Sequence, residues 1–291
     1  MRIGIYARED SKSPITDLSV GLRKLGHEAI FRRPNFFHES DKEQFDTVAL
    51  LGQKPECNRR ILSYYSRRKV PVLLLDYSPL QPSHSPIMRS WYMGWGSYGW
   101  LPDTIPEGAN RSIKYSWLLL RPIKKKRPVE GYILYCGQVP GDAFHGLSDT
   151  QMKERVAFEI AQIREHTKRK VIFRPHPHYQ QAIHWKVGAD EGMPSEVGID
   201  EALMGSWALV TVNSNSCLDA IRLGVPAFVT GVSAYSRIVN TDLSQIDSPI
   251  VPDSEAVSNF YERYSHTSWE RNEFLDGSAA QFMLERMPNV I

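Results

Sequence analysis

Short apolar segments alternate with amphipathic segments along the first third of the chain. The predicted strands are residues 2–7, 27–31, 47–51 and 70–75. The predicted helices are residues 17–25, where Leu18, Leu22 and Leu25 share one face, and residues 58–66. Because strands and helices alternate at this spacing, the pattern predicts βαβ units around a parallel sheet. We therefore expect a Rossmann-like domain over residues 1–120.

The same alternation returns after residue 130. The predicted elements are strand 131–136, helix 151–166, strand 171–173, helix 199–205, strand 208–212, helix 215–223, strand 227–230 and helices 253–264 and 269–286. Between the two series lies a basic, Pro-flanked stretch that is typical of a linker, residues 121–130. The pattern predicts an α/β fold with two Rossmann-like domains facing across a cleft. The second domain spans residues 131–255, and a helical tail, 256–291, packs back toward the first.

Composition changes this interpretation little. The chain has 291 residues, 42% of them hydrophobic, with a net charge of +2. Its three cysteines are widely spaced, which favours a reducing compartment and argues against a cysteine zinc site. No apolar run approaches the ~20 residues of a membrane helix, and the N-terminus lacks a signal-peptide pattern. We expect a cytoplasmic protein. Basic clusters such as 67–69 and 124–127 are either solvated segments or a polyanion-binding surface.

The end of the predicted strand 171–173 carries the sequence Arg-Pro-His-Pro-His. Prolines on both sides of His176 hold the backbone extended and fix an imidazole and the Arg174 guanidinium at a strand end. In open α/β sheets, ligands bind at that edge. His176 and Arg174 are therefore candidates for binding a nucleotide phosphate or ribose. A plain surface turn and, less favoured, a metal site remain alternatives.

Small polar residues follow the predicted strand 208–212: Asn213, Ser214, Asn215 and Ser216. They precede a helix, and a helix N-terminus presents unpaired N–H groups that bind anions. The same residues cap helices, so a capping role and phosphate binding are compatible. We expect these four residues to bind the phosphates of a nucleotide.

Two further loops follow strands. Residues 137–146 contain Gln138, Asp142 and His145, and the latter two are suited to acid–base chemistry or to binding substrate hydroxyls. The first loop contains Asp10, a candidate base, and Lys12, a candidate substrate contact. In both loops, an ordinary polar turn is the alternative.

Aromatic residues cluster between residues 90 and 108, and Trp95 is a candidate for stacking on a sugar or base, with packing between domains as the alternative. The glycines among these rings favour a shaped loop. The chain lacks the phosphate-loop, dinucleotide-binding, nucleophile-elbow and zinc-protease motifs. We also expect no essential metal.

These features together resemble GT-B-type nucleotide-sugar glycosyltransferases, in particular the capsule-polysaccharide-synthesis group and its bacteriophage relatives. The similar motifs are Gln138-x-x-x-Asp142, Arg174-Pro-His-Pro177, Ser214–Ser216 with Gly224-x-Pro226, and the Trp269-Glu-Arg-Asn-Glu273 segment with Gly277. The resemblance covers most of residues 131–280.

The resemblance implies that Asp142 is the catalytic carboxylate, that His176 contacts the donor nucleotide, and that Ser214 and Ser216 hold its phosphate. Gln138, His145, Lys12 and Trp95 are then candidates for contacts to the acceptor or sugar. It implies a UDP-sugar or CMP-sugar as co-substrate and no other cofactor. As acceptor we favour hydroxymethylpyrimidine bases of phage DNA, in the cytoplasm of a bacterial host. The alternatives are a surface-polysaccharide acceptor, an epimerase of the same fold, and a non-catalytic protein that binds nucleotide-sugars or polyanions.

Overall fold

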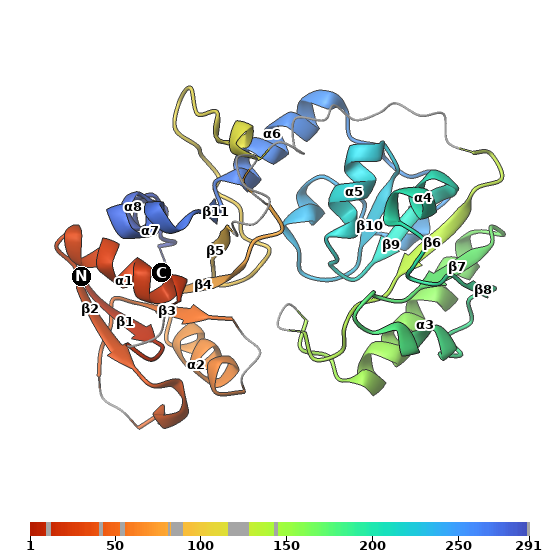
Figure 1. Ribbon diagram of the computed structural model, residues 1–291. Helices are drawn as coiled ribbons and strands as arrows, with labels where there is room; N and C mark the ends of the chain where they lie inside the picture. The colour runs from red at the N-terminus through yellow and green to blue at the C-terminus, as the bar shows by residue number, and fades with distance from the viewer. Residues whose placement is uncertain are drawn as a thin grey trace. The chain divides into compact units, whose positions relative to one another are not determined.

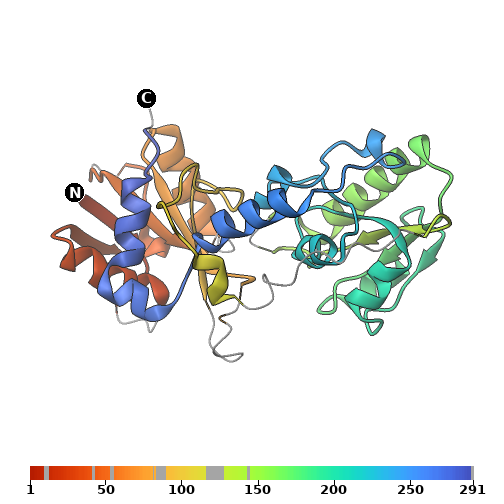
Figure 2. The same ribbon diagram turned by 90° about the horizontal axis from the view of Figure 1, so that it is seen from above.

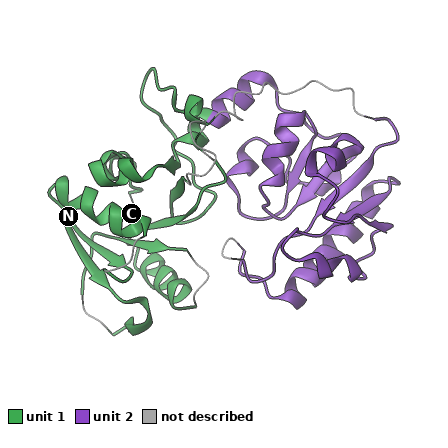
Figure 3. Cartoon of the chain, viewed as in Figure 1, with its two compact units in different colours: residues 1–117, 262–291 green, residues 118–261 purple. Residues whose placement is uncertain are grey.

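The chain forms two compact α/β units, coloured separately in Figure 3. Unit 1 comprises Met1–Trp117 and Glu262–Ile291, and unit 2 comprises Leu118–Tyr261. The computed structural model describes residues 1–9, 13–40, 43–52, 56–80, 82, 90–115, 128–142 and 145–289. Each unit holds a sheet built largely of parallel strands with helices packed on it, so the predicted class of two Rossmann-like α/β domains is confirmed (Figure 1). Most of the predicted linker, residues 121–127, lies outside the described residues.

Unit 1 contains a six-stranded sheet in the order β11-β5-β4-β3-β1-β2. Its elements are β1 (Arg2–Tyr6), α1 (Pro14–Lys24), β2 (Glu28–Arg32), η1 (Pro34–Phe36), β3 (Thr47–Leu51), α2 (Glu56–Arg67), β4 (Val72–Tyr77), β5 (Trp91–Trp95), η2 (Arg111–Lys114), β11 (Ser268–Trp269), α7 (Arg271–Asp276) and α8 (Ser278–Glu285). The four strands β2, β1, β3 and β4 are parallel, whereas β5 and β11 extend the sheet in antiparallel fashion. Helix α1 starts at Pro14, three residues before the predicted start, because proline suits the first helical turn.

The aromatic segment around residue 92 is a strand where the sequence suggested a loop. Trp91–Trp95 pairs with β4 as β5, and Tyr92 and Trp95 are both buried. The Tyr92 hydroxyl donates to the carbonyls of Ser97 and Trp100, so its ring passes over Gly94, where a side chain would collide with it. Pairing across the sheet therefore outweighs the loop preference of the glycines.

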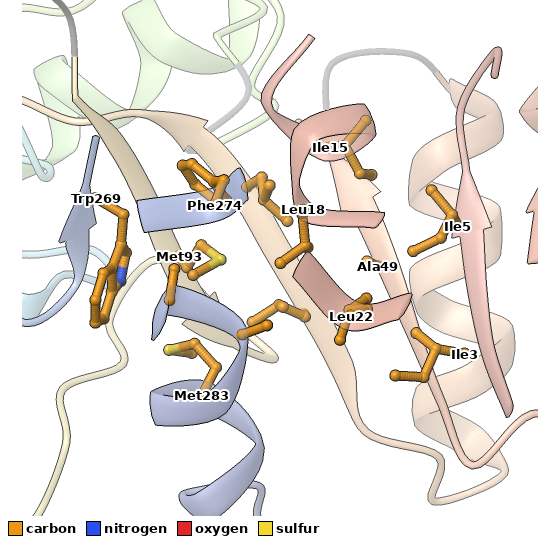
Figure 4. Packing of buried hydrophobic residues seen from close by; sticks show 14 of the residues in the cluster. Ile3, Ile5, Ile15, Leu18, Leu22, Ala49, Met93, Trp269, Phe274 and Met283 are labelled. Carbon is orange, nitrogen blue, oxygen red and sulfur yellow. The ribbon is translucent and has the colours of Figure 1, made fainter. Parts of the chain in front are cut away.

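The C-terminal segment completes the core of unit 1. Helices α7 and α8 pack against α1 (Figure 2), and Gly21 of α1 permits this contact because a Cβ there would lie 2.2 Å from the Phe274 carbonyl oxygen. Phe274 and Met283 are fully buried among Ile15, Leu18 and residues of the sheet (Figure 4). Burying each such side chain contributes about 1.5–3 kcal/mol.

The single helix predicted over residues 269–286 is wrong. Residues 268–269 form β11, and the remainder is divided into α7 and α8 at Gly277, whose φ of 97° lies in the left-handed region. Glycine adopts this conformation without steric cost, so the chain turns there and both short helices reach the same core.

A buried ion-pair network joins η2 to the C-terminal segment within unit 1. The Arg111 guanidinium donates to both carboxylate oxygens of Glu273 at 2.6 and 2.7 Å and lies 4.0 Å from the ring centroid of Trp269. Lys114 also donates to Glu273, at 2.7 Å. Burial opposes the ionised form of Glu273, but the hydrogen bonds and charge of Arg111 outweigh it and lower the pKa of Glu273 to about 2.

Unit 2 contains a five-stranded parallel sheet in the order β10-β9-β6-β7-β8. Its elements are β6 (Tyr132–Cys136), α3 (Asp149–His166), β7 (Val171–Arg174), η4 (Gln180–His184), β8 (Glu191–Gly192), α4 (Ile199–Met204), β9 (Ser206–Thr211), α5 (Ser216–Leu223), β10 (Ala227–Val229), η5 (Ala234–Arg237), η6 (Leu243–Gln245) and the first two turns of α6 (Ser254–Ser265). The boundary between the units falls within α6, between Tyr261 and Glu262.

Helix α3 covers one face of the unit 2 sheet. Ser148 caps it in a capping box with Gln151, which satisfies two N–H groups at the helix start. Val156 and Ile160 are buried against Ile133 and Tyr135 of β6. Asp142 and His145 lie in the segment between β6 and this helix.

We predict that Glu273→Gln destabilises the protein by about 3 kcal/mol at neutral pH, because the buried Arg111 loses the carboxylate to which it donates two hydrogen bonds. The folded-state pKa of Glu273 is depressed from 4.5 to about 2. Its stabilisation is therefore fully present above about pH 4.5 and is lost as the pH falls toward 2. Denaturant unfolding as a function of pH measures this. The exposed Glu285→Gln serves as control, and equal effects of both substitutions, or a deficit independent of pH, would contradict the prediction.

Candidate functional site

The connectivity of the unit 2 sheet creates a switch point between β6 and β9. From β6 the chain proceeds to β7 and β8 on one side, then returns to β9 and β10 on the other side. The loops after β6 and β9 therefore leave the sheet toward opposite faces, and ligands of open α/β sheets bind at such a position. Because all five strands are parallel, the predicted loops after β6, β7 and β9 meet at the same carboxyl edge.

Gln138 and Asn213 bridge this switch point. The Gln138 side chain donates from Nε2 to Asn213 Oδ1 at 2.6 Å and accepts the Asn213 backbone N–H at 3.1 Å. Asn213 Nδ2 donates in turn to the Val232 carbonyl. The sequence suggested that Gln138 contacts the acceptor and that Asn213 binds phosphate. Both residues are buried, and their side chains are bonded within the protein. Their amide groups are used to hold the two loops together.

The loop between β9 and α5 offers hydrogen-bond donors that the protein leaves unused. Within the described part of the chain, the N–H groups of Ser214 and Asn215 have no acceptor, and the buried Ser216 hydroxyl has no hydrogen-bond partner. Ser214 Oγ accepts the Ser216 N–H, and Asn215 Oδ1 accepts the Tyr235 hydroxyl at 2.7 Å. These contacts fix the loop at the N-terminus of α5, where the helix dipole favours an anion.

Arg174 lies at the end of β7 but points into the protein. Its Nη2 donates to the carbonyls of Ser195 and Val197 at 3.0 and 2.9 Å, and the residue is 7% exposed. Its Nε is also buried and has no partner. The guanidinium is thus committed to the loop before α4, so its contribution to the site is chiefly its positive charge.

His176 stays half-exposed at the same edge, between buried Pro175 and exposed Pro177. Its Nδ1 accepts the His178 backbone N–H at 3.1 Å, which leaves the proton of the neutral ring on Nε2. Burial, together with the charges of His178 and Arg174, lowers the pKa of His176 below 6.5. At neutral pH the ring therefore presents an uncharged N–H donor.

Asp142 is electrostatically coupled to two histidines. Burial lowers the pKa of both His145 and His176, and the Asp142 carboxylate partly offsets this effect at each ring. His145 accepts the Leu147 N–H at Nδ1, and its buried Nε2 has no hydrogen-bond partner. The structure thus brings together a carboxylate and two neutral imidazoles beside the switch point, an arrangement suited to proton transfer.

Arg155 of α3 is a site residue that sequence reasoning missed. It donates from Nε to Glu159 and from Nη2 to the Thr230 carbonyl, which follows β10 at the same carboxyl edge. Its charge also contributes to lowering the pKa of His145. The i, i+4 spacing of Arg155 and Glu159 was visible in the sequence, but only the fold places the pair beside the loop of His145.

Two of the other predicted site residues cannot be placed, and a third is buried in unit 1. Asp10 and Lys12 lie outside the described residues. Trp95 belongs to the core of unit 1, where it is 4% exposed and its indole N–H donates to the Met283 carbonyl at 3.1 Å. An acceptor cannot stack on a buried ring, so the prediction for Trp95 is wrong.

The described residues contain no group of three or more His, Cys, Asp or Glu side chains positioned to hold a metal ion. All three cysteines are free. Each described helix is too short or too polar to cross a lipid bilayer.

No protein-family model matches this sequence, and no curated protein matches it either. Among solved structures, the chain is similar to the beta Kdo 2,4 transferase KpsC of Thermosulfurimonas dismutans, with 15% identity, a TM-score of 0.50, and coverage of 91% of this chain and 90% of that one. The beta Kdo 2,7 transferase KpsC of the same organism follows with 14% identity, a TM-score of 0.45, and coverage of 97% and 100%. At 15% identity the first likeness concerns the fold, and the chain shares that transferase's fold over nearly its whole length.

We predict that His145 and His176 both titrate below pH 6.5 and that Asp142→Asn lowers both midpoints further, because a stabilising negative charge is removed. Imidazole carbon–proton NMR spectra, assigned with His145→Gln and His176→Gln, measure the two midpoints. Glu165→Gln, on the exposed face of α3, should move neither. Titration midpoints above pH 6.5 would contradict the prediction. Midpoints that Asp142→Asn leaves unchanged would show that the carboxylate and the two imidazole rings are not coupled.

Proposed function

We propose that this protein is a GT-B-type glycosyltransferase that moves a sugar from a nucleotide-sugar donor to an acceptor hydroxyl. The observation that carries the proposal is the set of unused donors at the unit 2 switch point. It comprises the N–H groups of Ser214 and Asn215, the Ser216 hydroxyl and the neutral His176 ring beside Asp142. The shared fold with a Kdo transferase supports the same reaction class.

The donor phosphate binds at the start of α5 in this proposal. The free N–H groups of Ser214 and Asn215 and the Ser216 hydroxyl hydrogen-bond its oxygens, and the helix dipole adds to the attraction. His176 donates from Nε2 to the nucleotide. UDP-sugars and CMP-sugars are the donors to test first, because both carry phosphate at the sugar linkage.

Sugar transfer then requires one proton acceptor and one stabilised leaving group. The acceptor oxygen attacks the anomeric carbon, the bond between that carbon and the phosphate oxygen breaks, and the Asp142 carboxylate takes the hydroxyl proton. The departing nucleotide carries the negative charge, which the donors at α5 and His176 stabilise. Asp10 is the second candidate for the base, and Lys12 for a substrate contact.

For the acceptor we favour a hydroxymethylpyrimidine base in DNA, because basic clusters occur along the chain and a DNA acceptor is a polyanion. With such an acceptor the reaction belongs in the bacterial cytoplasm. A surface polysaccharide is the second candidate, and the name of the similar Kdo transferase favours it.

The decisive test incubates the full chain with UDP-, GDP- and CMP-sugars and DNA that contains hydroxymethylcytosine, and measures nucleoside masses. We expect the mass of one sugar to be gained on the modified base only. Asp142→Asn should lower the rate about 10²–10⁴-fold, which is the usual contribution of a general base. Glu165→Gln should retain full activity.

Other results of this experiment would indicate a different acceptor or a different function. Gain of a sugar on a polysaccharide acceptor alone would move the acceptor away from DNA. Turnover of the donor without any acceptor would indicate an epimerase. Thermal stabilisation by a nucleotide-sugar without turnover on any acceptor would contradict catalysis.

A further inference from the structure

A basic surface with an exposed aromatic ring lies at one edge of the unit 1 sheet. Strands β1, β2 and β3 are parallel, so the segments that follow them emerge at the same carboxyl edge. Arg33 and η1 directly follow β2, and α2 follows β3. In open α/β sheets this is the edge where ligands bind.

Contacts between η1 and α2 hold the two segments together (α2 is orange in Figure 1). The Cys57 thiol donates to Asn35 Oδ1 at 3.4 Å, and the ring of Phe37 packs edge-on against Tyr64 with centroids 5.1 Å apart. Phe36, between these two anchored residues, is 75% exposed. Arg60 lies three residues after Cys57 and four before Tyr64, so it is on the side of α2 that meets η1.

The positive charge here is only partly neutralised. Within α2 the single acidic residue is Glu56, whereas Arg59, Arg60 and Arg67 are all exposed. Arg67 pairs with Glu39 at 3.2 Å. Among the described residues, Arg33, Arg59 and Arg60 have no acidic partner, so their guanidinium groups are available to a ligand.

We propose that Arg33, Phe36 and Arg60, the α2–η1 face, bind a DNA strand, with the two arginines on phosphates and Phe36 stacked on a base. The proposal rests on the proposed function, because it assigns the surface that holds a DNA acceptor. The combination of unpaired arginines with an exposed ring is that of single-strand binding surfaces, where bases stack on aromatic side chains and cations track the backbone. The planar guanidinium matches phosphate geometry.

The test measures binding of a fluorescein-labelled single-stranded 20-mer by anisotropy, without donor and at several salt concentrations. Each phosphate contact contributes about 0.7 to the slope of log K against log salt. Arg33→Ala/Arg60→Ala should therefore reduce the slope by about 1.4. Phe36→Ala should weaken binding by about 5- to 100-fold and leave the slope unchanged, because stacking is not ionic.

Matched controls lie on unit 2. Lys168→Ala/Lys186→Ala removes two exposed cations, and Ile250→Ala removes an apolar side chain that is 72% exposed. Neither should change DNA binding by more than about twofold. The proposal fails if the lysine variant weakens binding as much as the arginine variant. It also fails if polysialic acid displaces the 20-mer as well as unlabelled DNA does at equal charge, which would make the face one for anionic polysaccharides.

DNA binding and sugar transfer are measured in separate experiments. The proposed DNA-binding surface and the proposed glycosyltransferase function can therefore be contradicted independently. Binding through the α2–η1 face without sugar transfer to DNA would overturn the function and retain the surface. Transfer to DNA at full rate by Arg33→Ala/Arg60→Ala and by Phe36→Ala would retain the function and overturn the surface.

Discussion

The pairing of two buried amides, Gln138 and Asn213, is the constraint on which the candidate site depends. A switch point in a parallel sheet sends neighbouring loops toward opposite faces, and nothing in the backbone ladder keeps them together. The side chain of Gln138 does so by bonding both the side chain and the backbone of Asn213. A buried amide left without its partner is costly, so this pair favours one relative position of the two loops.

Near the Gln138–Asn213 pair, some polar groups are hydrogen-bonded within the protein and others are not. Arg174 is bonded to loop carbonyls and Asn215 to Tyr235, whereas the N–H groups of Ser214 and Asn215 and the Ser216 hydroxyl find no acceptor in the described chain. The Ser216 hydroxyl is buried, and buried polar groups are normally paired. An anionic ligand at this helix N-terminus would accept from all three donors. The neutral His176 ring adds a donor without adding charge.

Unit 1 uses electrostatics differently. Within its core, Arg111 and Glu273 neutralise each other and attach η2 to the C-terminal segment, which supplies Phe274 and Met283 to the same core. On its surface, Arg33 and Arg60 have no acidic partner among the described residues. An arginine with a buried carboxylate beside it thus stabilises the fold. An exposed arginine without an acidic partner remains able to bind an anion.

The sequence by itself determined the α/β class and most strand positions, because buried parallel strands are short apolar runs that local periodicity reveals. It also located the strand-end loops that carry Asp142, His176 and Ser214.

Only the tertiary structure decided which side chains of these and the other predicted site residues form contacts within the protein and which remain available to a ligand. Gln138, Asn213, Arg174 and Trp95 turned inward because partners distant in sequence were there to satisfy or cover them. Likewise, Gly277 divided a helical pattern because two short helices, and not one long one, reach the core beside α1. Such choices depend on contacts between distant residues, which no local pattern encodes.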